Sequence, residues 1–240
     1  MVSGFPKTAC GNNKSEYADV SVKHQHIPMR LLVTGFGPFP RMPRNPSAAL
    51  ARSVAAAPRL RRLGIEARAA VLTTAYATLA AELDPLLAER PDAVLMIGVA
   101  GRERQVRVET RATSRRSTLF PDRHGEVPRR AGAEGAREAA RRSRVNAGAA
   151  LRALLRHGLP ARISRDAGRY LCNAAYFRAL TRRGPTLFIH IPKPPKAGRK
   201  GARAKRTASG PSQALTEAMV EVAVLLAREA RAVVAASGIR

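Results

Sequence analysis

The sequence predicts an α/β fold in a single domain, built on a largely parallel sheet. From Met29 onward, short apolar segments alternate with segments that have helical patterns. The connections between successive apolar segments are long enough for helical crossovers, which join parallel strands. No similarity recurs at a period of about 20–50 residues, which argues against a solenoid. A chain of 240 residues with 45% hydrophobic residues can bury one full core.

Several segments have the length and apolar pattern of β-strands. Residues 92–100 are apolar almost throughout, which predicts a central strand that is buried on both faces. Residues 105–113 alternate between apolar and polar side chains, which predicts a strand with one polar side. The expected strands, in chain order, are 29–36, 65–74, 92–100, 105–113, 161–165 and 186–192.

The segments between and after these strands predict helices. Asn45 is suited to cap the first helix, with Pro46 at its first position, and Gly158 ends the third. We expect Pro85 to interrupt the second helix, because proline has no N–H to donate. The expected helices are approximately 45–62, 76–91, 143–157, 169–183 and 212–234. Residues 114–142, rich in Arg, Gly and Pro, predict a long loop.

Two segments of the chain lack the pattern of helices or strands. Residues 1–28 are polar and unpatterned, and they lack the apolar stretch of a secretory signal. We therefore expect a disordered leader over 1–28 and one folded domain over 29–240. A cationic, low-complexity stretch predicts a basic surface loop at about 193–210. No run approaches the ~18–20 apolar residues of a transmembrane helix, so we expect no membrane partner.

The cysteines and histidines predict neither a disulfide framework nor a metal site. Cys10 lies in the expected leader, so Cys172 is the only cysteine in the body of the chain. A reducing, cytoplasmic location is the simplest interpretation. His24 and His26 also lie in the leader, and no Cys/His cluster has the spacing of metal ligands.

The charge of the chain is strongly positive, with 43 Lys and Arg against 17 Asp and Glu and a formal net charge of +26. Only seven of the cations are Lys, all before residue 24 or after residue 192, so the other 36 are Arg and the core region contains no Lys. The arginines are scattered along every predicted element, whereas a dedicated nucleic-acid protein gathers them on one surface. We interpret them as solvated faces in a GC-rich coding background and expect only non-specific binding of nucleic acid, if any.

Three polar residues stand where an α/β sheet collects its working groups, outside the carboxyl ends of strands. His190 lies near the end of the strand 186–192, Glu109 ends "QVRVE", and Cys172 lies in the first turn of a helix. A helix N-terminus favours a thiolate, and an imidazole oriented by a carboxylate would activate it. The residues alone leave a second interpretation open: Cys172 is a buried thiol, His190 an interior histidine and Glu109 the ion-pair partner of an arginine.

The motifs "TGFGPF", "GVAGR", "VETRA", "DAGRYLCN" and "FIHIP" occur in this order over about residues 29–236. On these motifs the chain resembles the pyroglutamyl-peptidase I family, cysteine peptidases that remove N-terminal pyroglutamate. The resemblance implies a three-layer α/β/α sandwich with a mostly parallel mixed sheet, of the phosphorylase/hydrolase-like type. It also implies a cytoplasmic enzyme, usually a homo-oligomer, that acts on peptides with an N-terminal pyroglutamate and uses no metal or cofactor.

The positions within these motifs imply roles for particular residues. Cys172 matches the nucleophile, His190 the general base and Glu109 the acidic third member, in a reaction that passes through a thioester acyl-enzyme. Phe36 and Phe39 match aromatic residues whose rings sandwich the pyrrolidone ring of the substrate. A neutral lactam offers no charge to bind, so packing on its faces and a few hydrogen bonds must recognise it. Ordinary core packing is the other interpretation of the two phenylalanines.

The chain departs from the family pattern close to these residues. Where the family has "ERxAxN", this chain has "ETRATS", so Thr110 stands in place of an Arg and Ser114 in place of an Asn. "SNSAG" becomes "SRDAG", which puts Arg165 and Asp166 near Cys172. These changes and the cationic loop support an alternative function: a catalytically degenerate homologue that binds an acidic partner or nucleic acid.

Overall fold

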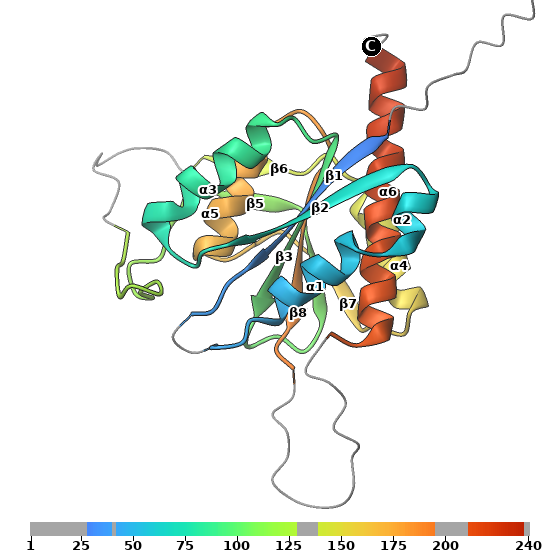
Figure 1. Ribbon diagram of the computed structural model, residues 1–240. Helices are drawn as coiled ribbons and strands as arrows, with labels where there is room; N and C mark the ends of the chain where they lie inside the picture. The colour runs from blue at the N-terminus through green and yellow to red at the C-terminus, as the bar shows by residue number, and fades with distance from the viewer. Residues whose placement is uncertain (1–27, 40–41, 129–138, 195–210, 238–240) are drawn as a thin grey trace, which may run out of the picture.

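The computed structural model describes residues 28–39, 42–128, 139–194 and 211–237 (Figure 1). The strands of the main sheet, in spatial order, are β2 (Ile65–Leu72), β1 (Met29–Phe36), β3 (Ala93–Ala100), β8 (Thr186–Pro192), β4 (Val106–Glu109) and β7 (Ala161–Ser164). A separate two-stranded sheet pairs β5 (Arg111–Thr113) with β6 (Ala140–Arg142). The helices are α1 (Pro46–Ala55), α2 (Pro58–Arg62), α3 (Tyr76–Ala88), α4 (Ala147–Arg156), α5 (Leu171–Ala179) and α6 (Gln213–Ser237).

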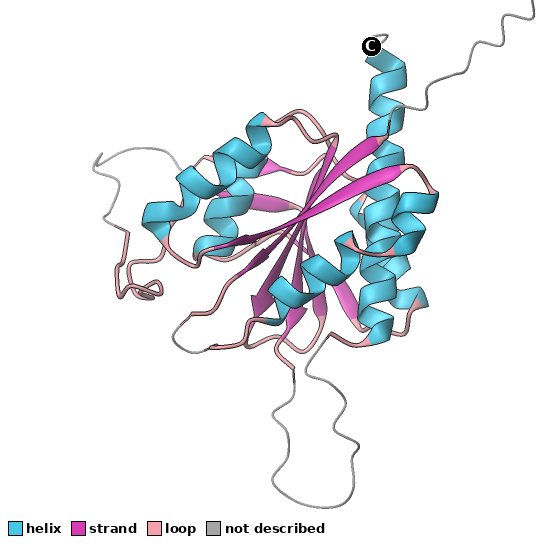
Figure 2. Ribbon diagram, in the orientation of Figure 1, coloured by secondary structure: helices cyan, strands magenta, loops and turns pink. Residues whose placement is uncertain are grey.

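The elements form the expected three-layer α/β/α sandwich. Helices α1, α2, α4 and α6 cover one face of the main sheet, and α3 and α5 cover the other (Figure 2). The layers arise because strands and helices alternate along the chain, so each crossover lays a helix on one face of the sheet. The fold class predicted from the sequence is confirmed.

Strand β4 reverses the direction of the sheet. The pairs β1–β2, β1–β3 and β3–β8 are parallel, whereas β4 runs antiparallel to β8. Strand β7 is parallel to β4, so these two strands both run against the other four. The sheet is therefore mixed and mostly parallel, as expected, with its antiparallel pair in the half that carries His190.

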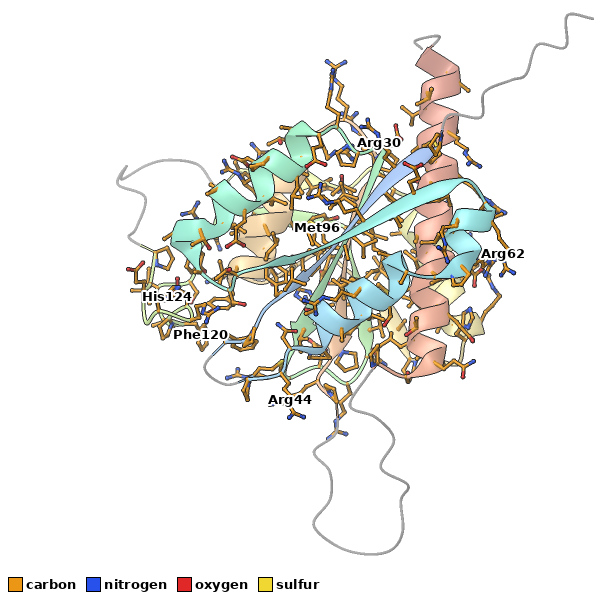
Figure 3. The ribbon with its side chains drawn as sticks, viewed as in Figure 1. Arg30, Arg44, Arg62, Met96, Phe120 and His124 are labelled. Atoms are coloured by element: carbon orange, nitrogen blue, oxygen red, sulfur yellow. The ribbon has the colours of Figure 1, made fainter. Side chains whose placement is uncertain are left out.

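Each face of the sheet has its own apolar core. Leu95 and Ile189 belong to the core on the face covered by α1, α4 and α6. Met96 and Phe188 belong to the core on the opposite face, and Figure 3 shows Met96 deep in the molecule. Because side chains alternate along a strand, His190 shares the face of Phe188, which is the face that α5 covers. Strand β3 is buried on both faces, as its apolar sequence predicts.

The strand expected over 105–113 is two strands in the structure. Thr110 separates them: its backbone N–H and its hydroxyl both donate to the carbonyl of Ser164, at 2.8 and 2.9 Å. After this junction the chain leaves the main sheet, and β5 pairs antiparallel with β6. The loop expected over 114–142 was therefore wrong at its end, because residues 140–142 form a strand.

The expected and observed helices differ at two prolines. The first expected helix divides at Pro58, because a proline disfavours helical geometry in the residue before it, and Ala57 is extended (φ −62°, ψ 123°). Asn45 caps α1 as predicted, and its side chain accepts a hydrogen bond from the N–H of Ser47. Pro85 does not interrupt α3, contrary to expectation. A proline removes a single helical hydrogen bond, and Pro85 lies in the last turn of α3, so little of the helix follows it.

Some expectations concern residues that the structure does not describe. The leader expected over 1–28 and the basic loop expected at 193–210 fall almost entirely outside the described ranges. Within those ranges, no helix is both long and apolar enough to cross a bilayer. Figure 3 labels three exposed arginines, Arg30, Arg44 and Arg62, which lie on separate parts of the surface, in agreement with a scattered charge.

Candidate active site

His190 and Glu109 form a buried hydrogen bond between neighbouring strands. Nδ1 of His190, in β8, lies 2.8 Å from Oε1 of Glu109, in β4. Glu109 is fully buried, and His190 is 5% exposed. Because an ionised carboxylate only accepts hydrogen bonds, Nδ1 carries the proton of a neutral imidazole and Nε2 is its basic nitrogen. The two residues therefore have the geometry of a base oriented by an acid.

The direction of β4 corrects one expectation about the site. Glu109 is expected at the same sheet edge as the carboxyl end of β8, but β4 is antiparallel to β8 and ends at the other edge. Glu109 is the register partner of Phe188, and Arg107 is the register partner of His190. Opposite and diagonal residues of paired strands share one face, so Arg107, Glu109 and His190 all lie on the face that α5 covers. Arg107 is thus a site residue that the sequence did not reveal.

The sulfur of Cys172 lies over the strand next to His190. Cys172 is in the first turn of α5, as predicted, and its Sγ atom is 2.9 Å from the place that a Cβ atom on Gly98 would take. Gly98 is the register partner of His190 in the parallel β3–β8 pair. The absent side chain of Gly98 leaves the space that the sulfur occupies. The structure therefore brings Cys172, His190 and Glu109 together on one face of the sheet.

The environment of Cys172 favours the neutral thiol. Burial, followed by the negative charge of Glu109, raises the pKa of the Cys172 thiol to about 12. The backbone N–H of Cys172 and the positive charge of Arg107 lower that pKa without cancelling the effect of burial. The helix N-terminus alone would favour a thiolate, but desolvation outweighs it here. The resting thiol therefore needs a base before it can act as a nucleophile.

The segments on either side of Cys172 are fixed by hydrogen bonds. Gly168 has a φ of 84°, which favours glycine, and its N–H donates to the side chain of Asp166 at 2.9 Å. Asn173 is 1% exposed, and its side chain exchanges hydrogen bonds with the backbone of Thr113 at 2.8 and 2.9 Å. Asn173 thereby fastens α5 to the segment after β4. Its place beside the cysteine in "LCN" is the sequence signal that points to this role.

Phe36 and Phe39 lie in different environments. Phe36 ends β1, is 2% exposed, and its ring centroid is 6.3 Å from that of Phe188. The ring of Phe188 is in turn 4.7 Å from the imidazole of His190, so Phe36 belongs to the packing around the base. Phe39 is partly exposed in the loop after β1, where its backbone exchanges hydrogen bonds with Met42. Of the two rings, Phe39 is the more accessible to a ligand.

A loop between β5 and β6 covers the start of α3. Asp122 is fully buried and accepts hydrogen bonds from three backbone N–H groups, among them that of Tyr76 at 2.9 Å. Tyr76 packs edge-on against Tyr170, which precedes α5, with ring centroids 5.9 Å apart. Figure 3 shows Phe120 and His124 on this loop, to one side of the sheet. The loop thus joins the start of α3 to the turn that leads to Cys172.

Two cavities lie away from the thiol. One of about 210 Å³ adjoins Arg30 and Glu89, and one of about 360 Å³ adjoins Arg141 and Thr186. Neither is lined by Cys172, so neither belongs to the chemistry of the thiol. Within the described ranges, no group of three or more His, Cys, Asp or Glu side chains is arranged to hold a metal ion.

The chain is similar to known peptidases over most of its length. The family model for pyroglutamyl peptidase matches residues 29–232. A pyrrolidone-carboxylate peptidase of Gloeobacter violaceus is 33% identical over 175 residues, an alignment that covers 70% of this chain and 83% of the relative.

Two solved structures resemble the fold closely. Pyroglutamyl peptidase I from Bacillus amyloliquefaciens has 25% identity and a TM-score of 0.66, and the match covers 85% of this chain and 97% of that one. Pyrrolidone carboxyl peptidase from Thermus thermophilus has 29% identity and a TM-score of 0.63, and the match covers 83% of this chain and 98% of that one.

Proposed function

Because this chain belongs to the pyroglutamyl peptidase family, we propose that Cys172, His190 and Glu109 hydrolyse the bond that follows an N-terminal pyroglutamyl residue. The chain is a cysteine peptidase of this family and has the fold of its solved relatives. The observation that supports the three roles is the buried His190–Glu109 hydrogen bond of 2.8 Å, which lies beside the turn that bears the sulfur. A neutral thiol needs a base, and an oriented imidazole is suited to be one.

The first half of the proposed reaction forms an acyl-enzyme. Nε2 of His190 takes the proton of the Cys172 thiol, and the thiolate attacks the carbonyl carbon of the pyroglutamyl residue. Backbone N–H groups in the first turn of α5 stabilise the oxyanion that forms. The carbon–nitrogen bond then breaks, the imidazolium returns its proton to the leaving amine, and a thioester remains on Cys172.

The second half regenerates the thiol. His190 removes a proton from a water molecule, and the resulting hydroxide attacks the thioester carbonyl. The carbon–sulfur bond breaks, the proton passes to the sulfur, and free pyroglutamate leaves. Glu109 accepts the hydrogen bond of Nδ1 throughout, so it stabilises the imidazolium each time it forms.

A fluorogenic pyroglutamyl amide tests this proposal. We expect the wild-type protein to release the fluorophore and Cys172→Ser to release none, at an unchanged melting temperature. The rate of release by His190→Gln should be lower by a factor of about 10³ or more, because this variant has lost the base. His157→Gln is the matched control, since His157 is paired with Glu221 on the opposite face of the sheet. Full activity in Cys172→Ser would disprove the assignment of the nucleophile.

The lactam ring of the substrate is proposed to pack against Phe39, with Phe36 beneath. This division follows the exposure of the two rings, since Phe36 is 2% exposed and Phe39 is partly accessible. An aromatic face suits a flat, neutral ring, for which packing area has to replace charge.

We also propose that the enzyme is a cytoplasmic homo-oligomer. This proposal is supported by Leu119, Phe120 and Val127, which are 81%, 49% and 44% exposed in one loop, because exposed large apolar side chains are common on association surfaces. Light scattering tests the oligomeric state, and Leu119→Asp should shift it toward the monomer. Nucleic acid should bind only non-specifically and be released by moderate salt.

The alternative of a degenerate homologue has no supporting observation among the described residues. Thr110, one of the departures behind it, bonds to Ser164 and so joins β4 to β7. The side chain of Asp166, another departure, accepts a hydrogen bond from the N–H of Gly168. Both residues therefore have structural roles that are compatible with an intact site.

A further inference from the structure

Arg107 contacts the acid of the site and stands opposite its base. It is the register partner of His190 in the antiparallel β4–β8 pair. Its Nε and Nη2 atoms lie 2.8 and 2.7 Å from Oε1 of Glu109. That oxygen is the one that accepts from His190, while Oε2 is buried without a hydrogen-bond partner among the described residues. The orientation of Glu109 therefore depends on donors that meet at a single oxygen.

The buried charge of Glu109 requires a permanent cation. Glu109 is fully buried, and a carboxylate in the interior is stable only when it is paired. His190 cannot supply the positive charge while it serves as the base, because it has to be neutral to take a proton. Arg107 is the other cation paired with Glu109 in the described ranges, and a guanidinium stays charged at every physiological pH. Arg107 thus supplies a positive charge to Glu109 that does not depend on His190.

Arg107 also contacts the turn that leads to the nucleophile. Its Nη2 donates to the carbonyl of Asp166, which precedes Cys172 in that turn. Its Nη1 lies 3.0 Å from Glu103, which fixes the guanidinium from the other side. The side chain is 14% exposed, so these bonds are largely shielded from water. One planar group therefore joins the acid of β4 to the turn before Cys172.

We propose that Arg107 is a positioning residue for the peptidase reaction: its guanidinium holds Glu109 against His190 and ties both to the segment that leads into α5 and Cys172. The inference rests on the roles proposed above for Cys172, His190 and Glu109. Lysine would keep the charge but lose the planar fork, so the two contributions of Arg107 can be separated.

The charged and titratable groups around the thiol and the imidazole make the effect of Arg107 predictable. Tyr76 from α3 and Tyr170 from the turn before α5 stay neutral, because burial raises the pKa of both phenols. Arg116 lies 6.0 Å from the ring centroid of Tyr76. Asp122 also acts on the two tyrosines, and Glu103 pairs with Arg107. Glu109 and Arg107, both from β4, act directly on the thiol. Without Arg107, the unbalanced Glu109 carboxylate favours the imidazolium, which cannot take the thiol proton, so the pH below which activity is lost (the acid limb of the profile) moves upward.

The test is the pH profile of kcat and kcat/KM for a fluorogenic pyroglutamyl amide, measured on full-length variants. Arg107→Met should lower kcat/KM at neutral pH about tenfold or more and move the acid limb upward by about half a unit or more. Arg107→Lys should keep the wild-type acid limb but lower kcat several-fold at unchanged KM, since the fork is lost. Arg162→Met is the matched control. Arg162 is the register partner of Arg107 on β7, is 46% exposed and pairs with Glu103.

A purely structural role of Arg107 predicts a different outcome. The proposal would be overturned if Arg107→Met had a lower melting temperature but lost activity at the same acid pH as the control variant Arg162→Met. If Arg107→Met does not fold, Arg107→Lys decides: a wild-type kcat refutes the positioning role, and a lower kcat at unchanged KM and unchanged acid limb supports it. Failure of the underlying site is distinguishable, because Cys172→Ser would then retain activity.

Discussion

The sulfur of Cys172 lies so close to Gly98 that even a methyl side chain does not fit at this glycine. A Cβ atom on Gly98 would lie 2.9 Å from Sγ of Cys172 and 2.7 Å from the ring of Phe188. Both distances are shorter than the separation of about 3.5–4.0 Å that non-bonded carbon atoms prefer. The position of the nucleophile therefore depends on a glycine in the neighbouring strand.

Gly98→Ala should disable catalysis by displacing the thiol. A shift of about 1 Å at a reacting atom can lower the rate about 10²-fold, and overpacking should cost about 1–3 kcal/mol of stability. Gly101→Ala is the control, because a Cβ there meets nothing within 4 Å. Activity assays and melting curves on both variants check the prediction. Wild-type activity in Gly98→Ala would show that the sulfur does not occupy this position during the reaction.

The Cys172 thiol should alkylate slowly at neutral pH. Burial and the Glu109 charge raise its pKa to about 12, so the reactive thiolate is scarce near pH 7. With iodoacetamide we expect a rate that rises about tenfold per pH unit between about pH 7 and 10 without levelling off. Mass spectrometry of the Cys172 peptide measures it, and the unfolded chain, which should level off near about pH 8.5, is the reference. A plateau below pH 8 would indicate a resting thiolate instead.

Phe36→Ala should lower the stability of the protein, whereas Phe39→Ala should weaken the binding of substrate. Phe36 is 2% exposed and packs on Phe188, so its truncation should cost about 3–5 kcal/mol of stability. Phe39 is partly exposed, so its loss should raise KM by an amount equivalent to about 1–3 kcal/mol and leave the alkylation rate of Cys172 unchanged. Melting temperature, alkylation rate and KM measured on both variants separate the effects. A large loss of stability in Phe39→Ala would count against its contact with the substrate.

Asp122→Ala should destabilise the loop at the start of α3. The variant loses the acceptor of three backbone N–H groups, which should lower the free energy of unfolding by about 1–3 kcal/mol. Burial acts to raise the pKa of Asp122, but the N–H groups of Tyr76, His124 and Glu126 outweigh it and the pKa is lowered.

The lowered pKa of Asp122 sets the pH at which its ionised carboxylate stops contributing to the stability of the fold. It is present above the unfolded-state pKa of about 3.9 and is lost as the pH falls through the lower folded-state pKa. Urea unfolding of wild type and Asp122→Ala should therefore differ at neutral pH and converge in acid. Glu126→Ala, which removes a charge from the same loop and leaves its backbone N–H in place, is the control. A constant difference across this pH range would argue against the linkage.

Local pattern was sufficient to predict most elements. The apolar runs that became β1, β3 and β8 have no stable place except the interior of a sheet, and the helix that follows β7 carries Cys172 in its first turn, as expected. Asn45 capped α1 because an asparagine before a proline is a local signal. Each of these features depends on neighbours within a few residues.

The direction of β4 and its junction with β5 could not be predicted in the same way. Val106 and Val108 alternate with Arg107 and Glu109 identically in a parallel and in an antiparallel strand. The junction at Thr110 depends on Ser164, which is 54 residues away in the chain. Arg107 was missed for this reason, since only the antiparallel register places it opposite His190.

The position of β4 between two strands that follow it in the chain has a consequence for the order of folding. Its partners are β8 and β7, so the Glu109–His190 hydrogen bond closes a loop of 81 residues. Such distant contacts form late, because the entropy of closing the loop opposes them. A nascent chain that has emerged only as far as α4 cannot hold an active site, whatever structure its first strands have acquired. During refolding from denaturant, peptide cleavage should accordingly return after helical circular dichroism, and the catalytic rate becomes a measure of how many chains have completed the sheet.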